Sequence, residues 1–156
     1  YATSNFQPVL ELLNFLHDAE RIADWSAEIE QLATRFVGNG QKTLAAAELF
    51  FKRGEDQDAM KVLAQQIDTG APQWPVYMKL GTAHLEQGQY EQALATYLKY
   101  PSFAGDGAAA DIDIDNAVNE AGSKFFWRGM EKPAREIFAR GANTSSGSDG
   151  DMAANI

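Results

Sequence analysis

The chain repeats itself at an interval of 34 residues, and this repeat restricts its fold more than any other feature. Gly54 and Gly88 are separated by this interval. The same register relates five further pairs, namely Thr43 and Tyr77, Ala47 and Gly81, Phe50 and His84, Ala59 and Ala93, and Leu63 and Tyr97. Self-similarity at such a period is typical of repeat architectures. Apolar residues in these segments recur every three or four positions, the period of an amphipathic helix. The sequence therefore predicts an all-α chain of repeated helix pairs.

The repeat also predicts where each helix pair begins and ends. Three pairs are expected, over 43–67, 75–100 and 112–140, with turns at Gly54, Gly88 and Gly129. The third copy follows the second at 41 residues, so about seven residues are inserted, most simply in the Gly- and Ala-rich loop from Phe103 to Ala110. An N-terminal segment over 8–37 has the helical period but a weaker match, and is predicted to be a degenerate or capping pair. The polar residues 142–156 are predicted to form a flexible tail.

The middle copy resembles a known repeat family. Leu80, Gly81, His84, Gly88, Tyr90, Ala93 and Tyr97 together resemble the tetratricopeptide repeat (TPR) pattern, and Gly122, Phe125, Gly129, Ala134 and Phe138 form a third copy. In this pattern Gly81 and Ala93 are small where two antiparallel helices cross, and Gly88 provides the turn. The resemblance implies one domain over 1–141, an α-α superhelix of three to four antiparallel TPR-like helix pairs. It also implies a role in binding other proteins.

In the TPR family a partner segment usually lies in a concave groove made by the first helix of each pair. The resemblance places twelve residues there: Leu44, Glu48, Phe51, Lys52, Met78, Thr82, Leu85, Glu86, Asn119, Ser123, Phe126 and Trp127. The paired Lys, Arg and Asn with which some family members clamp a chaperone tail are absent. Phe51, Leu85, Phe126 and Trp127 instead favour an apolar or amphipathic partner. Alternatively, these side chains pack on the chain's own N-terminal helices or tail.

Charge and composition exclude several other functions. The net charge is -9 and the pI about 4.6, which disfavours nucleic acid and anionic membrane surfaces as partners. No apolar run approaches the roughly 18 to 20 residues of a bilayer span, so direct membrane insertion is not expected. The chain has no cysteine, which excludes disulfides and thiolate chemistry. It starts at Tyr1, so a leader, an anchor or a neighbouring domain is compatible with it, and both a cytoplasmic and a periplasmic location remain open.

Few residues offer catalytic or metal-binding chemistry. Asp111, Asp113 and Asp115 resemble the start of a calcium loop, but Asn116 occupies the position of its sharp glycine turn, so an acidic helix cap is favoured. His17 and His84 lack neighbours at metal-ligand spacing. We therefore expect no catalysis and no cofactor, and interpret the chain as a protein-interaction scaffold, with homo-oligomerisation compatible. The alternatives are an accessory domain of a larger enzyme or of a bacterial envelope or secretion assembly, and a helical protein that binds a metal or a small molecule.

Overall fold

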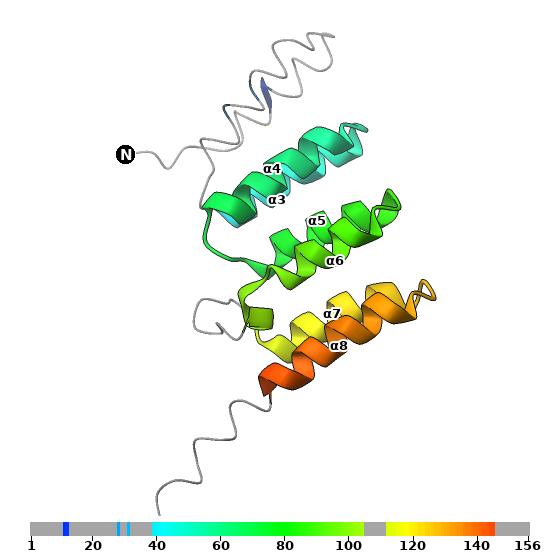
Figure 1. Ribbon diagram of the computed structural model, residues 1–156. Coiled ribbons are helices and arrows are strands. Elements are labelled where there is room, and N and C mark those ends of the chain that lie inside the picture. Colours follow the sequence, from blue (N-terminus) through cyan, green and yellow to red (C-terminus); the bar gives the residue numbers. More distant parts are fainter. Residues whose placement is uncertain (1–10, 13–27, 29–30, 32–38, 105–111, 146–156) are drawn as a thin grey trace, which may run out of the picture. The chain divides into compact units, whose positions relative to one another are not determined.

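The computed structural model describes residues 11–12, 28, 31, 39–104 and 112–145, and these residues are helical apart from short connections (Figure 1). No strand occurs in this described part, so the all-α prediction is confirmed. The chain divides into two compact units, 1–71 and 72–156, and each is described here by itself. The predicted N-terminal pair over 8–37 and residues 146–156 of the predicted tail lie outside the described residues, apart from a few isolated positions.

The first unit contains one described helix pair, α3 (Gly40–Lys52) and α4 (Asp56–Thr69). Helix α3 begins after Asn39, whose side chain accepts a hydrogen bond from the Lys42 N–H at 3.1 Å. This cap satisfies one of the unpaired N–H groups of the first helical turn. The two helices are tied in their buried interior by the Thr43 hydroxyl, which donates to the Gln66 side-chain oxygen at 3.1 Å. The range 43–67, predicted for the first repeat, lies within these two helices and the turn between them.

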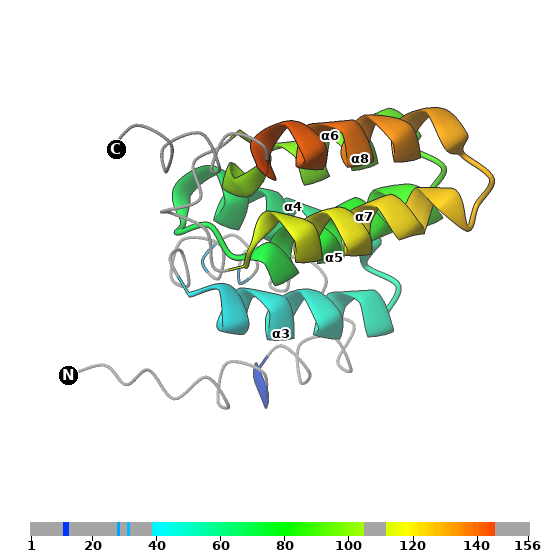
Figure 2. The ribbon, with the colours of Figure 1, turned by 90° about the horizontal axis from the view of Figure 1, so that it is seen from below.

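The second unit contains two helix pairs in sequence. The first is α5 (Trp74–Glu86) with α6 (Tyr90–Leu98), and the second is α7 (Ile114–Phe126) with α8 (Glu131–Ser145). A short 3-10 helix, η1 (Pro101–Ala104), follows α6. Helix α5 contacts α7, and α6 contacts α8, so the first helices form one row and the second helices another (Figure 2). Of the predicted loop from Phe103 to Ala110, Phe103 and Ala104 belong to η1, and residues 105–110 lie outside the described residues.

All three helix pairs turn in the same way. Gly54, Gly88 and Gly129 have φ values of 79°, 73° and 71°, a left-handed conformation that only glycine adopts without strain. In each turn the residue after the glycine donates its N–H to the carbonyl five residues earlier: Glu55 to Phe50 at 2.9 Å, Gln89 to His84 at 2.8 Å, and Met130 to Phe125 at 3.0 Å. This pattern is the Schellman motif, which closes a helix by satisfying its last carbonyls. The repeated glycine therefore has a structural cause.

Within the second unit, glycines let the two helices of a pair approach closely. A methyl group added at Gly81 would lie 2.2 Å from Cε1 of Tyr97, and one at Gly122 would lie 2.6 Å from Cε1 of Phe138. The large ring of the second helix thus fills the space left by the glycine of the first. A comparable contact joins Gly141 to Val118, where an added methyl group would lie 2.4 Å from Cγ2 of the valine.

This last contact explains why α8 is longer than the sequence predicts. The sequence predicts that the last helix ends at Arg140, because the residues from Gly141 onward are mostly polar. In the structure Gly141 is buried inside α8, which continues to Ser145. A larger residue there would push α8 away from Val118, so this glycine serves packing rather than termination, and residues 142–145 of the predicted tail are helical.

An aromatic cluster joins the two helix pairs of the second unit. The ring of Trp74, at the start of α5, lies 6.1 Å from Tyr97 and 4.8 Å from Tyr100, measured between centroids. Tyr97 in turn meets Phe125 of α7 edge-on at 6.0 Å. Each such pair contributes about 0.5 to 1.5 kcal/mol beyond the burial of its area. The indole N–H of Trp74 also donates to Glu120 Oε2 on α7 at 2.5 Å, so the pairs are held in one register.

Candidate partner-binding surface

The predicted groove residues fall on the first helices of the three pairs, as the resemblance implies. Four lie on α3 in the first unit: Leu44 and Phe51 are half-buried, whereas Glu48 and Lys52 are exposed. The other eight comprise seven residues on α5 and α7, which contact each other in the second unit, and Trp127, which directly follows α7. The structure thus brings these eight residues onto one row of helices.

The α5 residues of this row offer mostly polar surface. Met78 and Thr82 are half-buried, Glu86 is exposed, and Leu85 is only 3% exposed and so presents little area to a partner. The Thr82 hydroxyl lies 3.3 Å from the Tyr97 hydroxyl, and either oxygen can be the donor. The surface of this part of the row therefore offers the half-buried Thr82 hydroxyl and the exposed Glu86 carboxylate.

The environment of the Tyr97 hydroxyl reflects its position between helices. Burial raises the pKa of the Tyr97 phenol, and the negative charge of Glu86 raises it further. The hydrogen bond to Thr82 and the positive charge of Arg128 lower this pKa and partly offset the increase. The charges of Glu86 on α5 and of Arg128, which follows α7, therefore both act on this hydroxyl. The phenol stays protonated at neutral pH and can both donate and accept a hydrogen bond.

The α7 residues end in the most exposed aromatic side chains of the described chain. Asn119 is exposed, and Ser123 is half-buried with its hydroxyl donating to the Glu120 carbonyl at 3.0 Å. Phe126 is 55% exposed and Trp127 is 81% exposed. Their rings meet edge-on with centroids 5.3 Å apart. We call Phe126 and Trp127 the aromatic pair; it is the largest apolar surface that the predicted groove positions offer.

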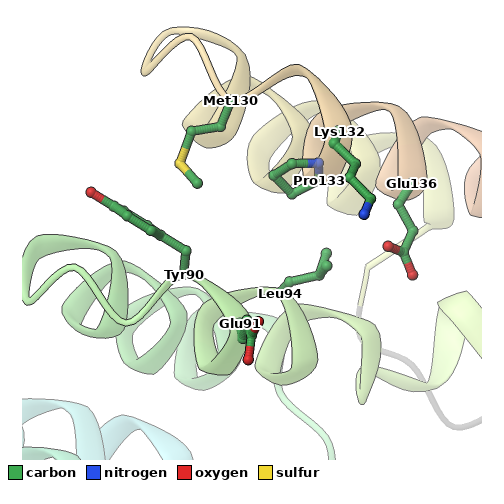
Figure 3. Close-up of a pocket in the computed structure, with 7 residues that line it drawn as sticks. All are labelled: Tyr90, Glu91, Leu94, Met130, Lys132, Pro133 and Glu136. Carbon is green, nitrogen blue, oxygen red and sulfur yellow. The ribbon is translucent and has the colours of Figure 1, made fainter.

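A cleft lies between α6 and α8, and it was not predicted from the sequence. This cleft of about 280 Å³ is lined by Tyr90, Glu91, Leu94, Met130, Lys132, Pro133 and Glu136. Figure 3 shows Tyr90 and Leu94 pointing from α6 toward Met130 and Pro133. The signal in the sequence was the spacing of Tyr90 and Leu94 at i and i+4, which places both on one face of α6.

The polar residues that resemble chemical motifs have structural roles where they are described. Asp113 caps α7, accepting from the Asn116 N–H at 2.9 Å, and His84 Nδ1 lies 2.6 Å from Gln89 Oε1 across the α5–α6 turn. Among residues 39–104 and 112–145 and the few described before them, no group of three or more His, Asp or Glu is placed to hold a metal. Asp111 and His17 lie outside the described residues. Of the described helices, none has the length and apolarity needed to cross a bilayer.

Comparison with known proteins supports the fold. No family model matches the sequence, and no curated protein matches it significantly. Among solved structures, a crystal structure of MamA, a TPR-like helical-repeat protein, is similar to this chain with a TM-score of 0.50. The match covers 93% of this chain and 81% of the MamA chain, at 18% sequence identity. Together with the three glycine turns and the helix pairs, this similarity shows that the chain has a TPR-like helical-repeat fold.

Proposed function

We propose that this protein is a non-catalytic interaction scaffold that captures a segment of another protein along its row of first helices. The observation that carries the proposal is the exposed aromatic pair, Phe126 and Trp127, at the end of α7. Large aromatic side chains dominate binding energies when a partner removes them from water. An indole that is 81% exposed does little for the stability of its own fold, so contact with a partner best explains an exposed tryptophan at this position.

The surroundings of the aromatic pair suit a peptide. Thr82 provides a half-buried hydroxyl group and Asn119 an exposed amide, both on the same row of helices. Such groups can pair with the backbone N–H and C=O groups of an extended or helical segment, while the aromatic pair supplies apolar contact. This arrangement supports an apolar or amphipathic partner.

The test compares the two rows of helices. Partners captured from the native host by the wild-type protein are purified, and their binding is measured by calorimetry. The double variant Phe126→Ala/Trp127→Ala should weaken binding by about 30-fold or more, because the loss of even one anchor of this kind costs about 2 kcal/mol. Tyr90→Ala removes an exposed aromatic side chain from the α6–α8 cleft and is the matched control. It should bind normally.

Circular dichroism must show unchanged helix content in both variants, since these side chains are exposed. Normal binding by the double variant would refute the proposal. Loss of binding in Tyr90→Ala alone would instead place the partner in the α6–α8 cleft.

A further inference from the structure

The three helical turns share a backbone but carry different charges. We compare equivalent windows that run from the last turn of the first helix into the second helix. Residues 49–61 contain three cations and three anions, and residues 83–95 contain two anions and no Lys or Arg. Residues 124–136 contain four cations and two anions. The window that surrounds the aromatic pair is thus the only one of the three with a positive net charge.

Two of these cations flank the aromatic pair in the sequence. Lys124 precedes it in the last turn of α7, and Arg128 follows it directly. The Arg128 guanidinium donates to the Lys124 carbonyl at 3.0 Å, which holds it along the end of the helix. Arg135, by contrast, is engaged by Glu131 at 3.2 Å on α8. We call Lys124 and Arg128 the cationic flank.

The helix dipole accounts for only part of this arrangement. Cations near a helix C-terminus are favoured by about 0.3 to 1 kcal/mol, and α3 also ends in basic residues, Lys52 and Arg53. There, however, Glu55 and the acidic first turn of α4 follow at once, and the residue equivalent to Phe126 is half-buried. Stabilisation of a helix end requires neither the excess of positive charge in 124–136 nor an exposed indole beside it. Their coincidence indicates a binding surface with a preferred charge.

We propose that the segment bound by the aromatic pair is an acidic peptide, with an apolar side chain against Phe126 and Trp127 and Asp or Glu residues facing Lys124 and Arg128. This inference rests on the proposed function and specifies the chemistry of its partner. A short segment is favoured over an extended polyanion because of where the charge lies. The window carries +2 and the whole chain -9, so all other residues together carry -11. A bilayer surface or a nucleic acid would extend over much of that negative charge. A short peptide at the window would meet less of it, Glu86 being a nearby anion, since it acts on the Tyr97 hydroxyl together with Arg128.

The experiment selects short random peptides displayed on phage with the intact protein and determines the composition of the enriched sequences. Peptides selected by the wild type should combine an apolar or aromatic residue with an excess of Asp and Glu. Lys124→Glu/Arg128→Glu should shift this excess to Lys and Arg. For an individual selected peptide, Lys124→Gln/Arg128→Gln should weaken binding by roughly three- to tenfold, in the range of two exposed ion pairs. Lys124→Arg/Arg128→Lys keeps both charges and should retain the binding.

The outcomes separate this inference from the proposed function. Two results overturn the inference and leave the scaffold function standing. One is that peptides whose binding depends on the aromatic pair show no excess of Asp and Glu. The other is that their binding does not weaken when the salt concentration rises from about 0.05 to about 0.5 M. Peptides bound equally by Phe126→Ala/Trp127→Ala overturn both. Failure of the wild type to enrich any peptide also overturns both. Binding to phosphatidylserine vesicles that requires the aromatic pair would identify a membrane surface as the partner. Self-association that requires the aromatic pair would identify a second copy of the chain as the partner. Either result overturns the inference of an acidic peptide.

Discussion

In the α5–α6 pair, the ring that fills the space opposite the crossing glycine is fully buried, whereas in the α7–α8 pair the corresponding ring is 40% exposed. The first ring, Tyr97, is enclosed by Gly81 on its own partner helix, by Trp74 and by Phe125 of the next pair. The second ring, Phe138, lies against Gly122, and no further helix pair follows α8 in the described part of the chain. The same repeat position is therefore interior in one pair and part of the surface in the other.

The same difference decides where a partner can bind. Leu85 and Phe126 occupy equivalent positions of the second and third copies, but Leu85 is buried and Phe126 is exposed. The α5–α6 pair uses its apolar residues to pack against the α7–α8 pair, whereas the last described pair leaves some of its apolar residues exposed. The comparison predicts that equivalent substitutions in the two pairs will have unequal effects on stability.

The largest difference is expected when the rings themselves are removed. Tyr97→Ala should lower the free energy of unfolding by about 3 to 5 kcal/mol, because it opens a cavity among Trp74, Gly81 and Phe125. Phe138→Ala should cost only about 1 to 2 kcal/mol, since solvent fills much of the space. Urea denaturation followed by far-UV circular dichroism measures both. Equal costs would show that Phe138 is as enclosed in solution as Tyr97.

A smaller difference is expected when the crossing glycines are enlarged. Gly81→Ala places a methyl group 2.2 Å from a ring that cannot move, so it should cost roughly 1 to 3 kcal/mol. Gly122→Ala makes a contact of 2.6 Å, but Phe138 can turn toward solvent. Alanine also favours a helix by about 1 kcal/mol over glycine, which offsets this displacement. Gly122→Ala should therefore be nearly neutral in the same urea experiment. A loss comparable to that of Gly81→Ala would contradict the mobility assigned to the Phe138 ring.

At the turn glycines, the same substitution should cost the two pairs the same loss of stability. Gly88 and Gly129 have nearly equal positive φ values, and an added methyl group at either would meet nothing within 4 Å. Alanine at each position should therefore cost only the backbone strain, about 1 kcal/mol. Thermal or urea unfolding of the two single variants should give the same loss. Unequal losses would mean that the two pairs differ in their turns and not only in their surroundings.

Much of this fold can be predicted from the sequence because the repeat constrains each pair locally. Apolar spacing identifies the inner face of each helix, and Gly54, Gly88 and Gly129 mark the turns, since their conformation is difficult for other residues. The register of Gly81 with Tyr97 follows from the same pattern. The end of α8 could not be predicted in this way, because the sequence does not distinguish a glycine that permits close packing from a glycine that ends a helix.

The candidate site was less predictable because exposure depends on neighbours. The family pattern placed Leu85, Phe126 and Trp127 on groove positions alike, and nothing in their local sequence indicates which of them another helix covers. The α6–α8 cleft depends in the same way on how two helices far apart in sequence lie together. The sequence contains the charge difference between the three turns, but the relevance of this difference to binding depends on the exposure of Trp127, which the structure shows.

The smallest effect expected is a difference in pH dependence between Tyr97 and a tyrosine placed in the terminal pair. Burial, partly offset by Thr82 and Arg128, raises the pKa of the folded Tyr97 phenol above the value of about 10 in an unfolded chain. The folded state therefore keeps a proton that the unfolded state loses. The stabilisation from Tyr97 is complete below pH 10 or so and is lost as the pH rises from there through the raised pKa.

Tyr97→Phe should remove this loss, an effect within about 1 kcal/mol near pH 10.5. Phe138→Tyr adds a phenol at the half-exposed position and should introduce no comparable loss, because water can solvate its anion. Urea midpoints of the three proteins at neutral and alkaline pH measure the difference; the same alkaline loss in the wild type and in Tyr97→Phe would show that the Tyr97 hydroxyl is not enclosed.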